Sequence, residues 1–359
     1  MHRPQPRPSS GKDCRPESGT RIGWYDGWLQ SAVGADGFWL RHRPGHHFRT
    51  AAGATGLLAR MLLALIARSG ISTVVDVGAG DGRLLAEVAA RSPRLRLIGL
   101  DVRPAPPMLP RDAIWLTGRW DSRAGAWRPG GGAAPVPLRS VIPAGPEPML
   151  IVCSEWLDDL PAVIAAGSSG DWHEVLVGPD GTESVGGPVP AADTAWLDRW
   201  WPGAGARAES GRTRDDAWSA VIGCLRPTGG LAVMIDYGHH RDTRPRAGSL
   251  AGYRLGRQVP PSPSPEINLT AHVAIDSLQA AGEAAGARTD LVLTQRQAVE
   301  RLLPGTGRTE RSDDTLARLQ ETSERRLLAD TLGDHWWLVQ SVDPAAPSLR
   351  GPTGAPAAE

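Results

Sequence analysis

The sequence predicts an α/β fold in which a mostly parallel sheet carries helices on both faces. Short runs of apolar and β-branched residues alternate along the chain with segments of helical periodicity, a pattern typical of parallel sheets. The clearest unit is the run 73–77, which a glycine-rich turn joins to an apolar helix start. Polar residues directly follow several predicted strands. Since ligands of open α/β sheets bind at the carboxyl ends of the strands, we expect the functional site there.

Composition argues against several classes of partner and location. The 359 residues have a formal net charge of zero, which gives no reason to expect nucleic acid or a membrane surface as a partner. Cys14, Cys153 and Cys224 lie far apart in the chain, so we expect no disulfide framework and no metal site, and we favour a reducing cytoplasm. The longest apolar segment, 57–67, is too short to span a membrane, and no signal peptide is visible.

The N-terminal region is predicted to be a disordered arm followed by a helical cap. Residues 1–20 are polar and rich in Pro and Arg, and we predict that they are disordered. The cap, 21–70, is expected to contain a helix at 22–33, a short strand at 38–40 and a longer helix that ends near Ser69. Thr50 is a suitable N-cap for this longer helix.

The main domain is predicted to span 71–342. Its strands are expected at 73–77, 95–100, 113–116, 149–153, 231–235, 288–293 and 335–339. Surface insertions are expected near 121–148 and 165–225, the second with a strand at 172–177 and helices at 194–201 and 214–225. Residues 239–266 should be irregular, further helices should end near 285, begin at 295 and span 315–328, and 343–359 should form a disordered tail.

The turn after the strand 73–77 predicts a nucleotide-like ligand. Its residues Gly78, Ala79, Gly80 and Gly82 let the backbone pass close to a ligand. Asp101, at the end of the next strand, lies at the spacing of an acid that binds ribose hydroxyls. These features fit both NAD-type and S-adenosylmethionine-type sites.

Three features favour S-adenosylmethionine over a dinucleotide. Asp76 lies inside the strand, two residues before the first glycine. An acid there can orient the turn and receive the ammonium group of a methionine moiety, whereas a dinucleotide site usually has an apolar residue. In addition, the turn is not a full G-x-G-x-x-G, and no second nucleotide-binding half is visible. Hydride transfer nevertheless stays open on the turn alone.

Several further segments of the chain carry short motifs. The segment 154–161, which carries Glu155 and Asp158, reads S-E-W-L-D-D-L-P. The segments 48–51, 236–238, 249–254, 270–273 and 293–295 read F-R-T-A, D-Y-G, S-L-A-G-Y-R, T-A-H-V and L-T-Q. In this order they resemble the N-E-x-x-D-A-x-P, F-x-T-[AS], D-Y-G, G-T-L-x-x-Y, T-A-H-V and L-T-Q segments of the MidA-type methyltransferases, the bacterial relatives of the mitochondrial complex I assembly arginine methyltransferase. The chain departs from the family at Ser154, where Asn is usual, at Asn268 and Ala274, where acids are usual, and at Asp76, where Glu is commoner.

The resemblance implies a Rossmann-like class I methyltransferase fold with a seven-stranded sheet, and methylation of a protein arginine. An arginine would be held by carboxylates in a bidentate fork. We expect Glu155 and Asp158 to form this substrate clamp, with Asp236, Tyr237 and His272 as second candidates. Glu155 and Thr50 join the residues expected to bind S-adenosylmethionine. The partner is then a protein that carries the target arginine, and the oligomeric state stays undecided.

Plainer interpretations of these residues, and other functions, stay open. Glu155 and Asp158 could simply complement a helix dipole, 236–238 could be a strand-end turn, and His272 could pack inside its helix. The acceptor could be a small molecule, because this fold hosts many acceptors. The chain could also be a non-catalytic assembly factor, and a dehydrogenase is the remaining alternative.

Overall fold

The computed structural model describes residues 20–42, 55–67, 69–143, 145–201, 207–303 and 315–343. The predicted disorder of 1–19 and 344–359, and the predicted cofactor contact of Thr50, lie outside these ranges. Within them, the predicted strands of the main sheet lie close to their predicted positions, and those at 73–77, 96–101, 149–154 and 230–236 are apolar runs that the sheet largely buries. No helix among the described residues is both long and apolar enough to cross a membrane.

The main sheet has eight strands in the order β17-β18-β11-β6-β2-β3-β4-β5. Their bounds are β2 Thr73–Val77, β3 Arg96–Asp101, β4 Ile114–Asp121, β5 Ala126–Pro129, β6 Met149–Ser154, β11 Gly230–Asp236, β17 Arg288–Thr294 and β18 Trp336–Val342. The five strands from β11 to β4 are parallel, and β18 lies antiparallel between β11 and β17. The prediction of seven strands is wrong by one, because the chain turns back after β4 and adds β5 at the edge.

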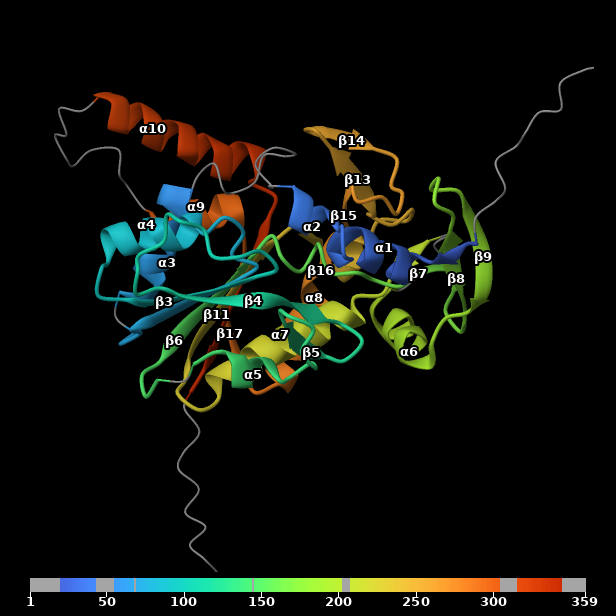
Figure 1. Cartoon of the computed structure of the whole chain (residues 1–359), viewed down its shortest axis with the longest axis horizontal. Coiled ribbons are helices and arrows are strands. Elements are labelled where there is room, and N and C mark those ends of the chain that lie inside the picture. The colour runs from blue at the N-terminus through green and yellow to red at the C-terminus, as the bar shows by residue number, and fades with distance from the viewer. Residues whose placement is uncertain are drawn as a thin grey trace, which may run out of the picture.

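Helices cover both faces of this sheet, as the alternation of strands and helices predicts. On one face lie α3 (Thr55–Ile66), α4 (Arg83–Arg91) and α9 (Gln295–Leu302), and on the other lie α5 (Leu138–Val141), α7 (Arg212–Leu225) and α8 (Ile275–Ala284) (Figure 1). Neighbouring residues of β2 pack into the two hydrophobic cores on opposite faces of the sheet. Val74 lies in the core that contains α3, and Val75 lies in the core that contains α7. The helix α10 (Thr315–Arg326) continues into the π-helical turn η4 (Leu327–Thr331) over α3 and α9.

A second, smaller sheet contains the predicted strand of the 165–225 insertion. It comprises β1 (Ile22–Gly23), β7 (Ile164–Ser168), β8 (Asp171–Val177), β9 (Glu183–Pro188) and β10 (Ala208–Glu209). The helix α1 (Trp24–Val33) packs on it through two fully buried tryptophans, Trp24 and Trp28. The helix α6 (Ala191–Trp200) packs beside it through Trp196 and Leu197.

Two local predictions are wrong. Residues 38–40 belong to a helical turn, α2 (Phe38–Arg41), in which the Leu40 and Arg41 N–H groups donate to the Gly37 carbonyl. The stretch 239–266 is not irregular, because it contains a hairpin of β13 (Ala251–Arg254) and β14 (Arg257–Val259). This hairpin pairs with β15 (Asn268–Thr270), while β12 (Gly238–His239) pairs with β16 (Val273–Ala274).

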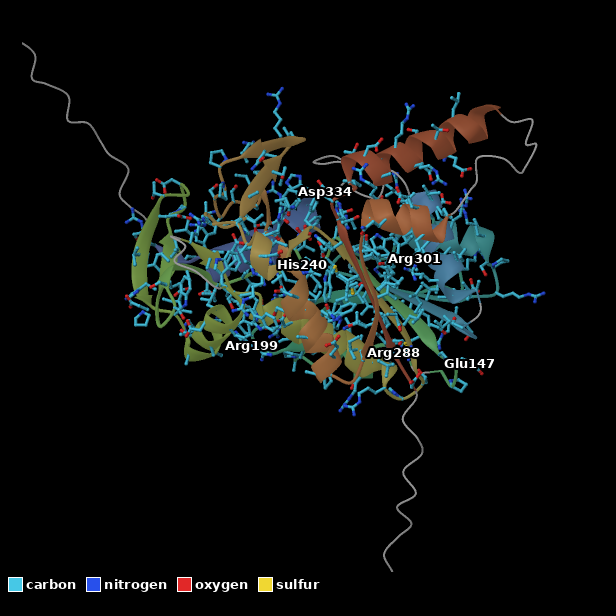
Figure 2. The ribbon with its side chains drawn as sticks, turned by 180° about the vertical axis from the view of Figure 1, so that it is seen from behind. Glu147, Arg199, His240, Arg288, Arg301 and Asp334 are labelled. Carbon is cyan, nitrogen blue, oxygen red and sulfur yellow. The ribbon has the colours of Figure 1, made fainter. Side chains whose placement is uncertain are left out.

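The carboxyl ends of the parallel strands face the α2 and β13 side of the molecule. His240, after β11, and Asp334, before the antiparallel β18, lie at this edge, whereas Glu147 and Arg288 lie at the opposite edge (Figure 2). From β2 the chain proceeds to β3 and β4 on one side, and then returns to β6 on the other. This reversal makes the carboxyl ends of β2 and β6 the expected ligand-binding position.

Candidate active site

A cavity of about 1160 Å³ lies at the carboxyl ends of β2, β3 and β6. The glycine turn after β2 forms one part of its wall, and the segment after β6 forms another. Residues of α1, the β13–β14 hairpin, β15 and η4 also line the cavity. One cavity therefore joins the predicted cofactor residues to the predicted substrate residues.

The glycine turn depends on the absence of a side chain at Gly78. Its φ is +77°, and an added Cβ would lie 2.6 Å from Cδ1 of Trp156. The Gly78 and Ala79 N–H groups donate to the Leu100 carbonyl at 2.9 and 3.0 Å. Gly82, by contrast, packs against Pro106 at the start of α4 and does not line the cavity. Gly78, Ala79, Gly80 and Asp81 of the turn therefore line the cavity, and Gly82 does not.

Asp101 lies at the end of β3 and fixes the glycine turn. Its Oδ2 accepts a hydrogen bond from Gly80 N–H at 2.8 Å, and its Oδ1 accepts from the backbone N–H and Nε of Arg103, both at 3.0 Å. A carboxylate oxygen has capacity for more than one donor. Asp101 also lines the cavity, so it can accept hydrogen bonds from ribose hydroxyls.

Asp76 is a buried acid in the cavity wall. Burial, followed by the neighbouring charge of Asp101, raises the pKa of Asp76 to about 7. Such a group is poorly solvated as an anion, and a cation placed beside it would favour its charged form. The position therefore fits the ammonium group of a methionine moiety.

Glu155 adopts a strained backbone conformation directly after β6. Its φ is +49°, which is uncommon for a residue with a side chain, and its N–H donates to the Ile235 carbonyl at 2.8 Å. Strain of this kind is typical of functional sites. Glu155 lines the cavity, and the next residue, Trp156, packs against the glycine turn. The strained turn thus places an acid where the two parts of the cavity meet.

Three further acids surround Glu155. Asp158 accepts a hydrogen bond from Thr270 Oγ1 at 2.8 Å, Asp159 accepts from Asn268 Nδ2 at 3.3 Å, and Asp236 accepts from Leu157 N–H at 3.0 Å. Burial and the neighbouring charge of Asp158 raise the pKa of Asp159 and of Asp236 well above the usual range. A hydrogen bond with Asp158 raises the pKa of Asp236 further.

These contacts divide the acids into two groups. Glu155, Asp158 and Asp159 line the cavity, whereas Asp236 is fully buried behind them. Asp236 Oδ2 accepts a hydrogen bond from the Leu157 N–H and so holds the backbone of the segment that carries Asp158. Glu155, Asp158 and Asp159 therefore form an acidic part of the cavity wall, and Asp236 supports it from behind.

Tyr237 and His272 form an aromatic part of the wall. Their rings stack with centroids 5.7 Å apart and an interplanar angle of 14°, and His335 lies against Tyr237 at 3.8 Å. Burial lowers the pKa of His272 and lowers that of His335 to about 4, and it raises the pKa of Tyr237. All three rings are therefore neutral at pH 7.

Arg214 is a site residue that the sequence analysis missed. Its guanidinium group donates to the carbonyls of Asp158 and His272, each at 3.0 Å, and of Leu160 at 3.1 Å. The side chain is 2% exposed, and its guanidinium carbon lies 5.7 Å from the Trp28 ring centroid. It thereby joins the segment after β6 to the segment before α8. In a chain rich in arginine, no sequence signal distinguishes it from the others.

Replacing Arg214 by Gln should destabilise the protein by about 1–3 kcal/mol, because buried carbonyls would lose their donors. Urea denaturation followed by circular dichroism measures the change. Arg226→Gln is the matched control, since Arg226 lies at the C-terminal end of the same helix, α7, and is exposed. An equal loss in both variants would show that Arg214 has no special part in joining these segments.

Comparison with known proteins identifies the fold. A family model described as "Putative S-adenosyl-L-methionine-dependent methyltransferase" matches residues 138–293. No curated protein matches the chain. A crystal structure of a Burkholderia thailandensis protein bound to S-adenosyl-homocysteine is 20% identical, with a TM-score of 0.67 over 90% of this chain and 89% of that chain. The chain has a methyltransferase-like α/β fold. The native crystal structure of a COG1565 superfamily protein from Burkholderia thailandensis matches with the same identity, coverage and TM-score.

The family-model match supports S-adenosylmethionine as the cofactor, and the residues of the methyltransferase-like fold fit this molecule. Asp76 suits its ammonium group, the backbone at Gly78–Gly80 allows close approach, and Asp101 suits its ribose. Thr50 lies outside the described residues. The cavity brings together the predicted residues Asp76, Gly78, Ala79, Gly80, Asp101, Glu155, Asp158, Tyr237 and His272.

Proposed function

We propose that this protein is an S-adenosylmethionine-dependent methyltransferase that methylates an arginine side chain of another protein. The family model and the fold support methyl transfer from this cofactor. The proposal for the acceptor depends chiefly on one observation. Three carboxyl groups, of Glu155, Asp158 and Asp159, line the same cavity as the glycine turn. A guanidinium group is the cation that paired carboxylates bind best, through parallel N–H···O bonds.

The acids would hold and orient the acceptor. When bound, S-adenosylmethionine supplies an electrophilic methyl group on its sulfonium. Glu155 and Asp158 would accept N–H bonds from the guanidinium, which leaves one nitrogen turned toward the methyl carbon. As the new N–C bond forms and the S–C bond breaks, the nitrogen must lose a proton, and a carboxylate of this group can accept it. The neutral rings of Tyr237 and His272 would flank the acceptor.

Calorimetric titration of the purified protein with S-adenosylmethionine and with NAD tests the cofactor. We expect binding of S-adenosylmethionine alone, and binding of NAD alone would contradict methyl transfer. Tritiated methyl transfer to cell-lysate proteins, followed by acid hydrolysis and amino-acid analysis, then tests the acceptor. Label in methylarginine supports the proposal. Label confined to small metabolites would favour a small-molecule acceptor, and no label with retained binding would favour a non-catalytic assembly factor.

A further inference from the structure

The hairpin of β13 and β14 is a part of the cavity wall that also reaches into solvent. Ala251, Tyr253 and Gly256 line the cavity, while Arg254, Leu255 and Arg257 are exposed. Figure 1 shows the hairpin standing out from the body of the molecule beside α2. A protein bound with one side chain in the cavity could therefore also contact this hairpin.

The exposed end of the hairpin carries two arginines that face each other. Arg254 and Arg257 are direct cross-strand partners at either side of the turn. Among the described residues neither has an acidic partner within ion-pair distance, whereas Arg41, Arg207 and Arg244 each pair with an acid. Like charges directly opposite in a hairpin are destabilising. Folding of the hairpin alone does not account for this pair.

The turn between the two arginines is also unfavourable for the isolated protein. Leu255 and Gly256 have φ values of +48° and +77°, as in a type I′ turn, for which Asn-Gly is the preferred sequence. Leu255 is therefore strained, and its side chain is 69% exposed. A strained, exposed leucine between two arginines presents an apolar contact flanked by positive charge.

We propose that this hairpin docks an acidic stretch of the substrate protein next to the target arginine. The proposal rests on the proposed function and specifies its substrate. The cavity wall is acidic at Glu155, Asp158 and Asp159, and the exposed end of the hairpin beside it is basic at Arg254 and Arg257. A segment in which the target arginine is neighboured by Asp or Glu and by an apolar residue is complementary both to the acidic cavity wall and to the basic end of the hairpin. The docking charges act on selection of the acceptor and not on cofactor binding.

The test is charge reversal at the hairpin. In Arg254→Glu/Arg257→Glu, tritiated methyl transfer to lysate proteins should fall at least tenfold, while S-adenosylmethionine affinity stays within twofold. Hexaglutamate added as a competitor should inhibit the wild type and not the variant. Arg226→Glu/Arg301→Glu is the control of equal net charge, because both residues are exposed and lie outside the cavity lining. It should behave as the wild type does.

The outcomes separate the docking proposal from the proposed function. If the wild type labels no protein, the proposed function fails. If the wild type labels proteins, and the hairpin variant labels them equally with equal response to hexaglutamate, the docking proposal is overturned. The milder Arg254→Gln/Arg257→Gln removes the like-charge pair and should not lower the melting temperature, so loss of labelling in this variant cannot be attributed to unfolding.

Discussion

Replacing Glu155 by Gln is expected to reduce methyl transfer at least a hundredfold while S-adenosylmethionine affinity changes less than threefold. The amide keeps the size of the side chain, but it removes the negative charge that would hold the guanidinium and the oxygen that could accept its proton. Loss of a general base of this kind typically costs a factor of about 10²–10⁴. The backbone strain at φ +49° stays in the variant, so the fold of the turn should be retained.

Initial rates of tritiated methyl transfer to lysate proteins, with calorimetry of cofactor binding, measure the two effects separately. Glu147→Gln is the matched control, because Glu147 is exposed and lies at the opposite end of the same strand, β6 (Figure 2). It should change neither quantity. Equal losses of transfer and of cofactor affinity in Glu155→Gln would place Glu155 in the cofactor site and would contradict its proposed contact with the acceptor.

Replacing Asp76 by Asn is expected to weaken S-adenosylmethionine binding by a factor of about 10–100, since hydrogen bonds to charged groups contribute about 1.5–3 kcal/mol. The effect should depend on pH. The pKa of Asp76 is raised to about 7 in the free protein, so below pH 7 the carboxyl is largely protonated. A bound ammonium group favours the carboxylate, and binding therefore releases a proton. Wild-type affinity should rise with pH up to about 7 and then level off.

The pH dependence of folding stability should have the opposite sign to that of cofactor affinity. A carboxyl whose pKa rises on folding stabilises the native state fully below its unfolded value of 3.8, and this contribution is lost as pH rises through the folded value. Without cofactor at pH 8, Asp76→Asn should therefore be more stable than the wild type. The acid would thus be retained for binding at a cost in stability.

Calorimetry in buffers of different ionisation enthalpy measures the released proton. Asp215→Asn serves as the control, because burial also raises the pKa of Asp215 to about 7, yet this residue bonds to Ser277 and Trp196 away from the cavity lining. It should leave proton release on cofactor binding unchanged. Proton release that persists in Asp76→Asn would assign the titrating group elsewhere.

The sequence allowed most of the sheet, and the cavity wall at the glycine turn, to be predicted, because both depend on local signals. The β-branched run of β2, the alternating glycines and Asp76 lie within a few residues of one another. The roles of Arg214 and Asn268 could not be predicted in this way. Each acts through a partner that is distant in sequence: Arg214 on the Asp158 carbonyl, and Asn268 on the Asp159 carboxyl group.

The hairpin was missed for a different reason. A type I′ turn is usually predicted from an Asn-Gly or Asp-Gly pair, but here the two central residues of the turn are Leu255 and Gly256. The run Phe38-Trp39-Leu40 predicts a strand by its propensity, whereas the Gly37 carbonyl accepts the hydrogen bonds of a helical turn there. In both segments the backbone geometry differs from the preference of the residues that form it.

The position of β18 has a consequence for how the chain folds during synthesis. β18 lies between β11 and β17, and within the described part of the chain it is the only strand that pairs with β17. Until residues 336–342 leave the ribosome, β11 and β17 each lack their β18 partner, and the edges that β18 later covers are unpaired. Exposed edges of this kind favour pairing with other chains, so completion of the sheet by β18 also removes a hazard of aggregation from the newly made protein.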